Sequence, residues 1–291
     1  MGFLSTLISG IGLGSVYAII ALGYSMVYGI AKMLNFAHGD VIMVGGYVAY
    51  FALTSYGLPL PVAVILSIVA CTILGVVVER LAYKPLRQAS NLAVLITAIG
   101  VSYFLQNAAQ LLWGSDTKIF PTVISSAAIS LGDLSVSYLT LITIAVCVLI
   151  MIFLSLFINK TKTGMAMRAC SEDKGAASLM GINVNQIISI TFAIGSGLAA
   201  IAAILLCATY PSVYPTLGSM PGIRAFTAAV LGGIGSIPGA FVGGVLLGII
   251  EILAKTYIST QLSDAIVFAV LIVVLLIKPT GLLGKKISEK V

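Results

Sequence analysis

The chain has 291 residues, of which 60% are hydrophobic and 8% are charged, with a formal net charge of +6. Soluble domains carry about 25% charged residues, so this composition excludes an ordinary soluble protein. The apolar residues come in runs of the about 20 residues that a helix needs to cross a bilayer, not in the short alternating segments of a barrel. The sequence therefore predicts an all-α, polytopic transmembrane helical bundle.

The cysteines favour neither a disulfide nor a metal site. Cys71, Cys147, Cys170 and Cys207 are scattered without the spacing of metal ligands, and three of them fall in apolar runs. A cysteine in such a run is usually a small packing residue.

The first apolar run, Met1–Ile30, contains no charged residue. It lacks the positive start and the small-residue cleavage site of a signal peptide, so we interpret it as a retained first helix. A polar break with Asn35, His38 and Asp40 follows, and then a second, short helix.

Nine apolar segments follow one another between polar breaks, which predicts about eight or nine membrane segments in one transmembrane domain, 1–291. In chain order they are 4–30, 41–56, 61–78, 91–112, 137–158, 186–208, 222–235, 239–255 and 264–278. The segment 222–235 is short and ends among glycines, so a broken or re-entrant helix is expected there. Interruptions in corresponding places of two halves point to a substrate path in transporters.

The basic residues predict the orientation, because Lys and Arg are enriched on the cytoplasmic side. An outside N-terminus and a cytoplasmic C-terminus place twelve of the fifteen basic residues inside. These are Lys32, Arg80, Lys84, Arg87, Lys160, Lys162, Arg168, Lys174, Lys278, Lys285, Lys286 and Lys290.

The long inner loop, 159–185, predicts a short amphipathic helix over about 171–180. Ser171 is a suitable N-cap, Glu172 and Asp173 suit the first helical turn, and Gly181 suits the helix end. Such a helix could lie on the lipid headgroups or dock on a soluble partner, and the residues leave both alternatives open.

Several distinctive motifs carry a resemblance to a known family. In order along the chain they are LGSVYAIIALGYSMVYGI, LNFAHGD, ERLAYKPLR, TAIGVSYFLQN, RACSEDKGAASLMGIN, RAFTAAVLGGIGSIPGA and KPTGLLG. Together they resemble the Liv-type branched-chain amino acid permeases of ATP-binding-cassette importers, specifically the shorter, H-type subunit. The resemblance runs from about Ile11 to Gly284.

This resemblance implies a set of partners in a prokaryotic plasma (inner) membrane. They are a homologous second permease subunit, two cytoplasmic ATP-binding subunits and an extracytoplasmic substrate-binding protein, with no nucleic acid. The chain lacks a Gly-x-x-x-x-Gly-Lys-Ser/Thr phosphate loop, so it is not expected to be an enzyme, and it is expected to need no cofactor.

The resemblance also makes the loop 159–185 a coupling loop for the ATPases. The family pattern has Glu-Ala-Ala and then Gly four positions later, and Gly175 stands where the Glu would be. The candidate ATPase-coupling residues are Arg168, Glu172, Asp173, Ala176, Ala177 and Gly181.

The first group of candidates for the translocation path is Asn35, His38 and Asp40. An ionisable residue at membrane depth is costly and usually faces a cavity or a partner. The alternative is a cytoplasmic turn whose polar groups are merely solvated. Because His38 is the only histidine, no catalytic role and no metal site are expected.

Two further path candidates lie on later segments. Gln106 shares one face of the fourth segment with Ser102 and Gln110, a stripe that serves either interhelical hydrogen bonding or a ligand. Arg224 near a helix start favours a nearby anion, either a substrate carboxylate or a structural partner such as Glu251 or Asp264.

The substrate follows from the resemblance alone, because the residues are equally compatible with branched-chain amino acids, urea or short amides. An ATP-independent channel or secondary transporter would need an ion site of its own, and no convincing carboxylate pair is evident. An intramembrane enzyme would need a nucleophile with a positioned base. The expected mechanism is alternating access driven by ATP binding in the partner subunits.

Overall fold

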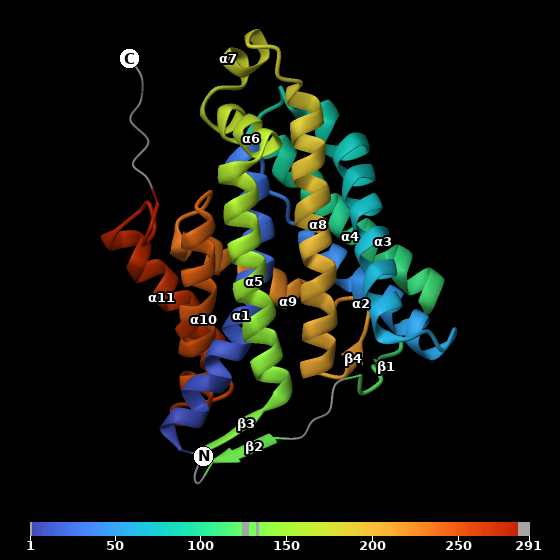
Figure 1. The fold of residues 1–291 in the computed structure, drawn as a ribbon, viewed down its shortest axis with the longest axis vertical. Helices are drawn as coiled ribbons and strands as arrows, with labels where there is room; N and C mark the ends of the chain where they lie inside the picture. The colour runs from blue at the N-terminus through green and yellow to red at the C-terminus, as the bar shows by residue number, and fades with distance from the viewer. Residues whose placement is uncertain (1, 124–127, 132–133, 285–291) are drawn as a thin grey trace.

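The structure is a computed structural model that describes residues 2–123, 128–131 and 134–284 (Figure 1). The helices are α1 (Phe3–Ala31), α2 (His38–Thr54), α3 (Leu60–Val78), α4 (Asn91–Trp113), α5 (Tyr138–Lys160), α6 (Lys162–Glu172), α7 (Lys174–Leu179), α8 (Val184–Thr209), α9 (Ser219–Gly232), α10 (Ile237–Tyr257) and α11 (Ser263–Ile277). A π-helical turn, Glu79–Tyr83, and a 3-10 turn, Lys84–Leu86, extend α3. Each of the nine predicted membrane segments corresponds to one helix, which confirms the helical bundle.

Within the described residues, six helices are long and apolar enough to span a membrane. They are α1, α3 with its extension, α4, α5, α8 and α10. The remaining three predicted segments are shorter, with 17 residues in α2, 14 in α9 and 15 in α11. At 1.5 Å per residue, α9 spans only about 21 Å, less than the ~30 Å hydrocarbon core.

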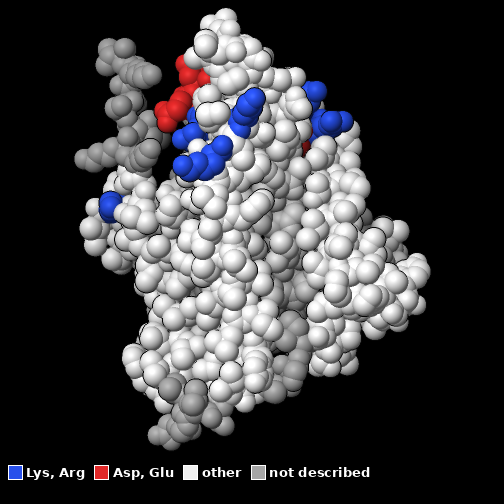
Figure 2. All heavy atoms as spheres, viewed as in Figure 1, with Lys and Arg blue, Asp and Glu red and all other residues white. Residues whose placement is uncertain are grey.

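Short strands lie at one end of the molecule. β1 (Lys118–Ile119) pairs with β4 (Ser212–Val213), and β2 (Ala128–Leu131) pairs with β3 (Leu134–Ser137), both antiparallel. Figure 1 shows all four strands at the end where the chain begins, and α6 and α7 at the opposite end. On the face drawn in Figure 2, the charged side chains gather toward the α6–α7 end.

The helices α1, α2 and α3 form one group, the helices α8, α9 and α10 form a second group, and the two groups pack on the same plan. In the first group α2 packs against α3, and in the second group α9 packs against α10. Across the groups, α1 packs against α10 and α3 against α8, while α2 lies on α8 and α9 lies on α1. This exchange of equivalent contacts is the arrangement of a structural repeat.

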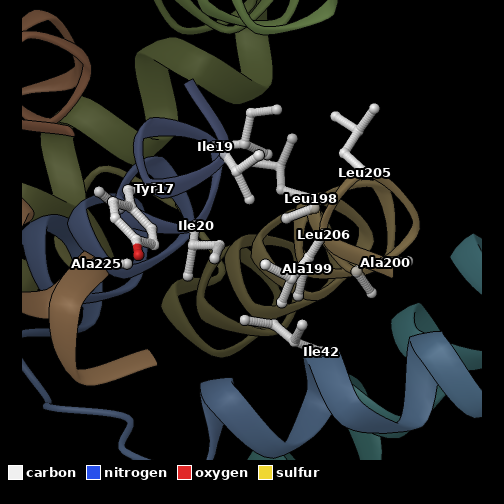
Figure 3. Packing of buried hydrophobic residues seen from close by; sticks show 14 of the residues in the cluster. Tyr17, Ile19, Ile20, Ile42, Leu198, Ala199, Ala200, Leu205, Leu206 and Ala225 are labelled. Atoms are coloured by element: carbon white, nitrogen blue, oxygen red, sulfur yellow. The ribbon is translucent and has the colours of Figure 1, made fainter. Parts of the chain in front are cut away.

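The core lies where α1 and α8 cross. Figure 3 shows Ile19 and Ile20 of α1 beside Leu198 and Ala199 of α8, with Ile42 of α2 beneath them. All five side chains are buried. Both central helices are therefore shielded from lipid by the rest of the bundle.

Small residues bring α1 and α10 into backbone contact. A Cβ atom on Gly14 would lie 2.7 Å from the carbonyl oxygen of Val245 and 2.8 Å from that of Gly244. A Cβ atom on Gly10 would lie 2.9 Å from the Cα atom of Ile249. Helices in lipid associate through such close packing, so these glycines serve the bundle.

Candidate functional site

The two short helices α2 and α9 meet at their N-termini. A Cβ atom on Gly39 would lie 2.5 Å from the carbonyl oxygen of Gly218, and one on Gly222 would lie 3.1 Å from the Cα atom of Gly39. The backbones therefore touch, and glycine is required on both sides. Neither the residue before α2, Ala37, nor Gly218 before α9 supplies a side-chain cap.

This meeting point lies inside the bundle. The ring of His38, the first residue of α2, contacts the α1 backbone at Ile20 and Gly23. These positions lie eight to eleven residues before the last residue of α1, or roughly 12–16 Å along its axis. After α1 ends, the segment 32–37 thus returns into the membrane region before α2 begins.

Gln106 of α4 joins the two half-helices. Its side-chain amide donates to Asp40 Oδ1 of α2 at 2.9 Å and to Ser219 Oγ of α9 at 3.3 Å. It also lies 3.2 Å from Ser102 Oγ, one turn earlier on its own helix. We call Asp40, Ser102, Gln106 and Ser219 the central polar cluster. The stripe predicted on the fourth segment thus supplies interhelical hydrogen bonds at this cluster.

His38 and Asp40 are each 1% exposed. The alternative of a solvated cytoplasmic turn is therefore wrong for both residues, because burial removes them from water. The His38 ring packs edge-on against Tyr24, with 4.7 Å between ring centroids. Its Nε2 atom has no hydrogen-bond partner among the described residues and points at the bare backbone of Gly23.

Asn35 fixes the segment between α1 and α2. Its Oδ1 atom accepts a hydrogen bond of 2.8 Å from the hydroxyl of Tyr83, and both side chains are buried. Tyr83 lies in the π-helical turn that extends α3. The same turn carries Glu79, which pairs with Arg87 and accepts a 2.6 Å hydrogen bond from Ser189 of α8.

Arg224 of α9 lies in a separate ion cluster. It contacts Glu251 of α10 at 2.9 Å, Asp264 of α11 at 2.5 Å and the hydroxyl of Tyr17 of α1 at 2.9 Å. Lys255 lies 2.5 Å from the same oxygen of Glu251. Both partners considered from the sequence are engaged, so the guanidinium ties α9 to three neighbouring helices.

The loop 159–185 contains two helices where one was predicted. Ser171 is not an N-cap, because it lies inside α6 and its hydroxyl bonds back to the carbonyl of Arg168. Asp173 separates the helices and caps α7, accepting from the amide of Ala176 at 2.9 Å. An aspartate that binds the N–H groups ahead of it starts a new helix rather than extending the old one. Glu172 therefore ends α6.

The end of α7 agrees with the prediction. Gly181 has a φ of +82°, the left-handed conformation that commonly terminates a helix. Ala177 is buried, whereas Leu179 and Met180 are 90% and 83% exposed. The tip of the loop thus presents two large apolar side chains.

The sequence did not single out four contributors to these sites. They are Tyr17, Tyr83 and Ser219, described above, and Lys174 of α7, whose ammonium group donates to the carbonyl of Ala31 at 2.6 Å. Each contacts a partner at least 48 positions away in the chain, and no local spacing signals such a contact.

Comparisons with known proteins identify the family. The model described as "Branched-chain amino acid transport system / permease component" matches residues 6–275. The high-affinity branched-chain amino acid transport system permease protein BraD of Pseudomonas aeruginosa is 46% identical over 99% of this chain and 98% of its own length. The corresponding protein LivH of Escherichia coli is 44% identical over the same shares. A solved chain of PsaBC from Streptococcus pneumoniae is similar with a TM-score of 0.49 and 14% identity, over 95% of this chain and 92% of that one. The chain therefore belongs to the branched-chain amino acid transport system permease component family.

Proposed function

We propose that this chain is a membrane-spanning permease subunit of an ATP-binding-cassette importer that moves branched-chain amino acids inward across a prokaryotic plasma membrane. Its N-terminus lies outside and its C-terminus lies in the cytoplasm. The family membership and the names of the relatives support the substrate class. The charged side chains toward the α6–α7 end support this orientation, because Lys and Arg are enriched on the cytoplasmic side.

The observation that carries the proposal is the meeting of the two helix N-termini at the central polar cluster. A helix N-terminus carries a partial positive charge, which suits the carboxylate of an amino acid in transit. The carboxylate of Asp40 suits the substrate ammonium. Because these groups come from α2, α4 and α9, a small displacement of either half-helix would open the site to one side of the membrane. Asn35 and His38 complete the path on the α2 side.

The second part of the proposal concerns energy coupling. The loop 159–185 docks on a cytoplasmic ATP-binding subunit through the exposed Leu179 and Met180, because an apolar tip of this kind fits a groove on a soluble partner. The residues Arg168, Glu172, Asp173, Ala176, Ala177 and Gly181 shape or surround this tip. The complete importer then contains a homologous second permease, two ATPases and an extracytoplasmic binding protein. ATP is hydrolysed in the ATPases.

The first experiment is purification of the chain in mild detergent with mass spectrometry of the associated proteins. We expect a P-loop ATPase and a related permease. Reconstitution of that complex with its binding protein in liposomes should then give ATP-dependent uptake of labelled leucine and none of labelled urea. Recovery of a stable homo-oligomer alone, with solute flux that needs no ATP, would instead indicate a channel or secondary transporter.

The charges on the coupling loop can be tested without breaking its helix cap. Glu172→Gln with Asp173→Asn keeps an oxygen at the cap position, whereas Glu172→Lys with Asp173→Lys removes it. The charge-reversed double variant should lose ATP-driven uptake while remaining in the membrane, and the neutral double variant, which keeps the cap, should lose it as well. Normal uptake by either variant would contradict the coupling role of these two side chains.

A further inference from the structure

The cytoplasmic loop contacts the point where the chain turns back into the membrane. The ammonium group of Lys174, the first residue of α7, donates to the carbonyl of Ala31 at 2.6 Å. Ala31 is the last residue of α1, where helix carbonyls lack partners within the helix and carry partial negative charge. A lysine from 143 positions away therefore caps the central helix of the bundle.

The next residue, Lys32, reverses the direction of the chain. Its φ of 58° and ψ of 32° are left-handed, and it is the only non-glycine residue with positive φ in the described part of the chain. A side chain in this conformation costs roughly 1 kcal/mol, so the surrounding contacts must hold it. The N–H of Lys32 bonds to the carbonyl of Tyr28, while Lys174 holds the adjoining carbonyl of Ala31.

From this turn, a short buried segment leads directly to the central polar cluster. Met33, Asn35 and Ala37 are buried, and Asn35 is fixed by Tyr83. The segment ends at His38, where α2 begins. With so few residues between the turn and α2, a displacement of Ala31 or Lys32 must also displace the start of α2.

The loop is held on α1 by apolar packing as well. Ile30 of α1 packs with Met167 and Cys170 of α6 and with Ala177 of α7. This packing is adaptable, because apolar contacts are non-directional, whereas the hydrogen bond from Lys174 fixes one atom to one atom.

The charge environment disfavours the charged form of Lys174 at this contact. Partial burial lowers the pKa of Lys174, and the nearby positive charges of Arg87 and Lys32 lower it further. The ammonium group is thus held among like charges by a carbonyl oxygen. Movement of α7 away from α1 would break this hydrogen bond.

We propose that Lys174 is the positioning residue through which movement of the α6–α7 loop sets the position of the α2 start. This inference rests on the proposed function, in which that loop receives the motion of the ATPases. While Lys174 is hydrogen-bonded to Ala31, it holds the left-handed turn at Lys32 and keeps Gly39 against Gly218. When α7 moves, the turn is released and the two half-helices part.

The test compares Lys174→Met, which removes the donor, with Lys174→Arg, which keeps a cationic donor. Lys162→Met, an exposed lysine at the start of α6, is the matched control. Hydrogen exchange of residues 32–41 is measured by mass spectrometry on the purified full chain, so this readout needs no transport activity. We expect exchange to rise at least tenfold in Lys174→Met and to stay within twofold of the wild type in the other two variants. Unchanged exchange in Lys174→Met would overturn the positioning role.

Uptake per ATP hydrolysed in the reconstituted importer is the second readout. Lys174→Met should hydrolyse ATP as the wild type does, but its leucine uptake per ATP should fall about tenfold. Lys174→Arg should restore the wild-type ratio of uptake to ATP hydrolysis. Lys32→Gly relieves the left-handed strain and so should fold, but its turn no longer depends on Lys174, and the same loss of uptake per ATP is therefore expected. Raised exchange with normal uptake per ATP would overturn the transmission step. A wild-type complex without leucine uptake would contradict the proposed function but leave the exchange result valid.

Discussion

Arg224 and Glu251 join two helices of the second helix group, with 2.9 Å between Nη1 of the arginine and Oε1 of the glutamate. The Glu251 side chain is fully buried, and Asp264 pairs with the other terminal nitrogen of the guanidinium, Nη2. A buried ion pair contributes little net stability over an apolar pair, but removal of one partner leaves a charge without compensation. The pair therefore favours one arrangement of α9 against its neighbours.

The first prediction is that Arg224→Met destabilises the fold by about 3–5 kcal/mol, because Glu251 would be left buried with only Lys255. The matched control is Lys255→Met, which removes the other cation from the same oxygen at a side chain that is 27% exposed. Its loss should be below about 1 kcal/mol. Unfolding in mixed detergent micelles measures both, and equal losses would contradict the central role of Arg224.

The α1–α10 contact predicts that Gly14→Val separates the two helices. The new side chain would meet the carbonyl oxygens of Gly244 and Val245, and backbone cannot move aside as a flexible side chain can. We expect a loss of at least about 2 kcal/mol in folding free energy. Gly100→Val on α4 is the control, because nothing lies within 4 Å of a Cβ atom there. Thermal unfolding of both variants in one detergent measures the two losses, and equal losses would contradict the close contact between α1 and α10.

Gln106→Leu tests the central polar cluster. It removes the amide that donates to Asp40, and a hydrogen bond to a charged group is worth about 1.5–3 kcal/mol. Leucine uptake should therefore fall roughly ten- to a hundredfold. Gln110→Leu, one turn later on the same helix and exposed, should transport normally. Equal uptake by the two variants would show that the cluster has no role in transport.

Leu179→Asp should prevent recovery of the ATPase during purification, since a charge replaces the most exposed apolar side chain of α7. Ser178→Asp adds the same charge at the neighbouring exposed position without removing apolar surface. The membrane content of both variants should match the wild type. Should Ser178→Asp also lose the ATPase, charge rather than apolar contact would explain the effect.

Cys170 should react slowly with maleimides although it lies on the loop 159–185 between two membrane helices. Its side chain is 1% exposed, and burial raises the pKa of its thiol despite the opposing effect of the Lys174 charge. The thiolate is the reacting form, so both factors slow the reaction. An introduced cysteine, Ser178→Cys, provides the exposed comparison. Rapid labelling of Cys170 would mean that α6 does not pack on α1 as described.

Patterns short enough to lie on one helix predicted much of this structure. The apolar runs predict the helices, because a bilayer demands long apolar segments. The small residues of the GAFVGGVLLG run predict a close helix contact. Glu251 and Lys255 stand at i, i+4 spacing, which places them on one helix face, and their ion pair is formed.

Contacts between distant segments could not be predicted in this way. Gln106 and Ser219 are 113 positions apart, and only the meeting of two half-helices brings them together. The loop prediction failed because two residues there suit a helix start. Ser171 and Asp173 are both common N-caps, and the structure shows that Asp173 caps α7 while Ser171 lies inside α6.

The burial of α1 has a consequence for how the protein is made. The partner that covers its glycine face, α10, begins about 200 residues later in the chain. At synthesis rates of 5–20 residues per second, the ribosome needs roughly 10–40 s to supply it. Throughout that interval the face of α1 that carries Gly10 and Gly14 contacts lipid or a substitute helix. Nascent chains should therefore depend on an insertion partner that shields α1, and truncation before α10 should leave a product that membrane proteases remove.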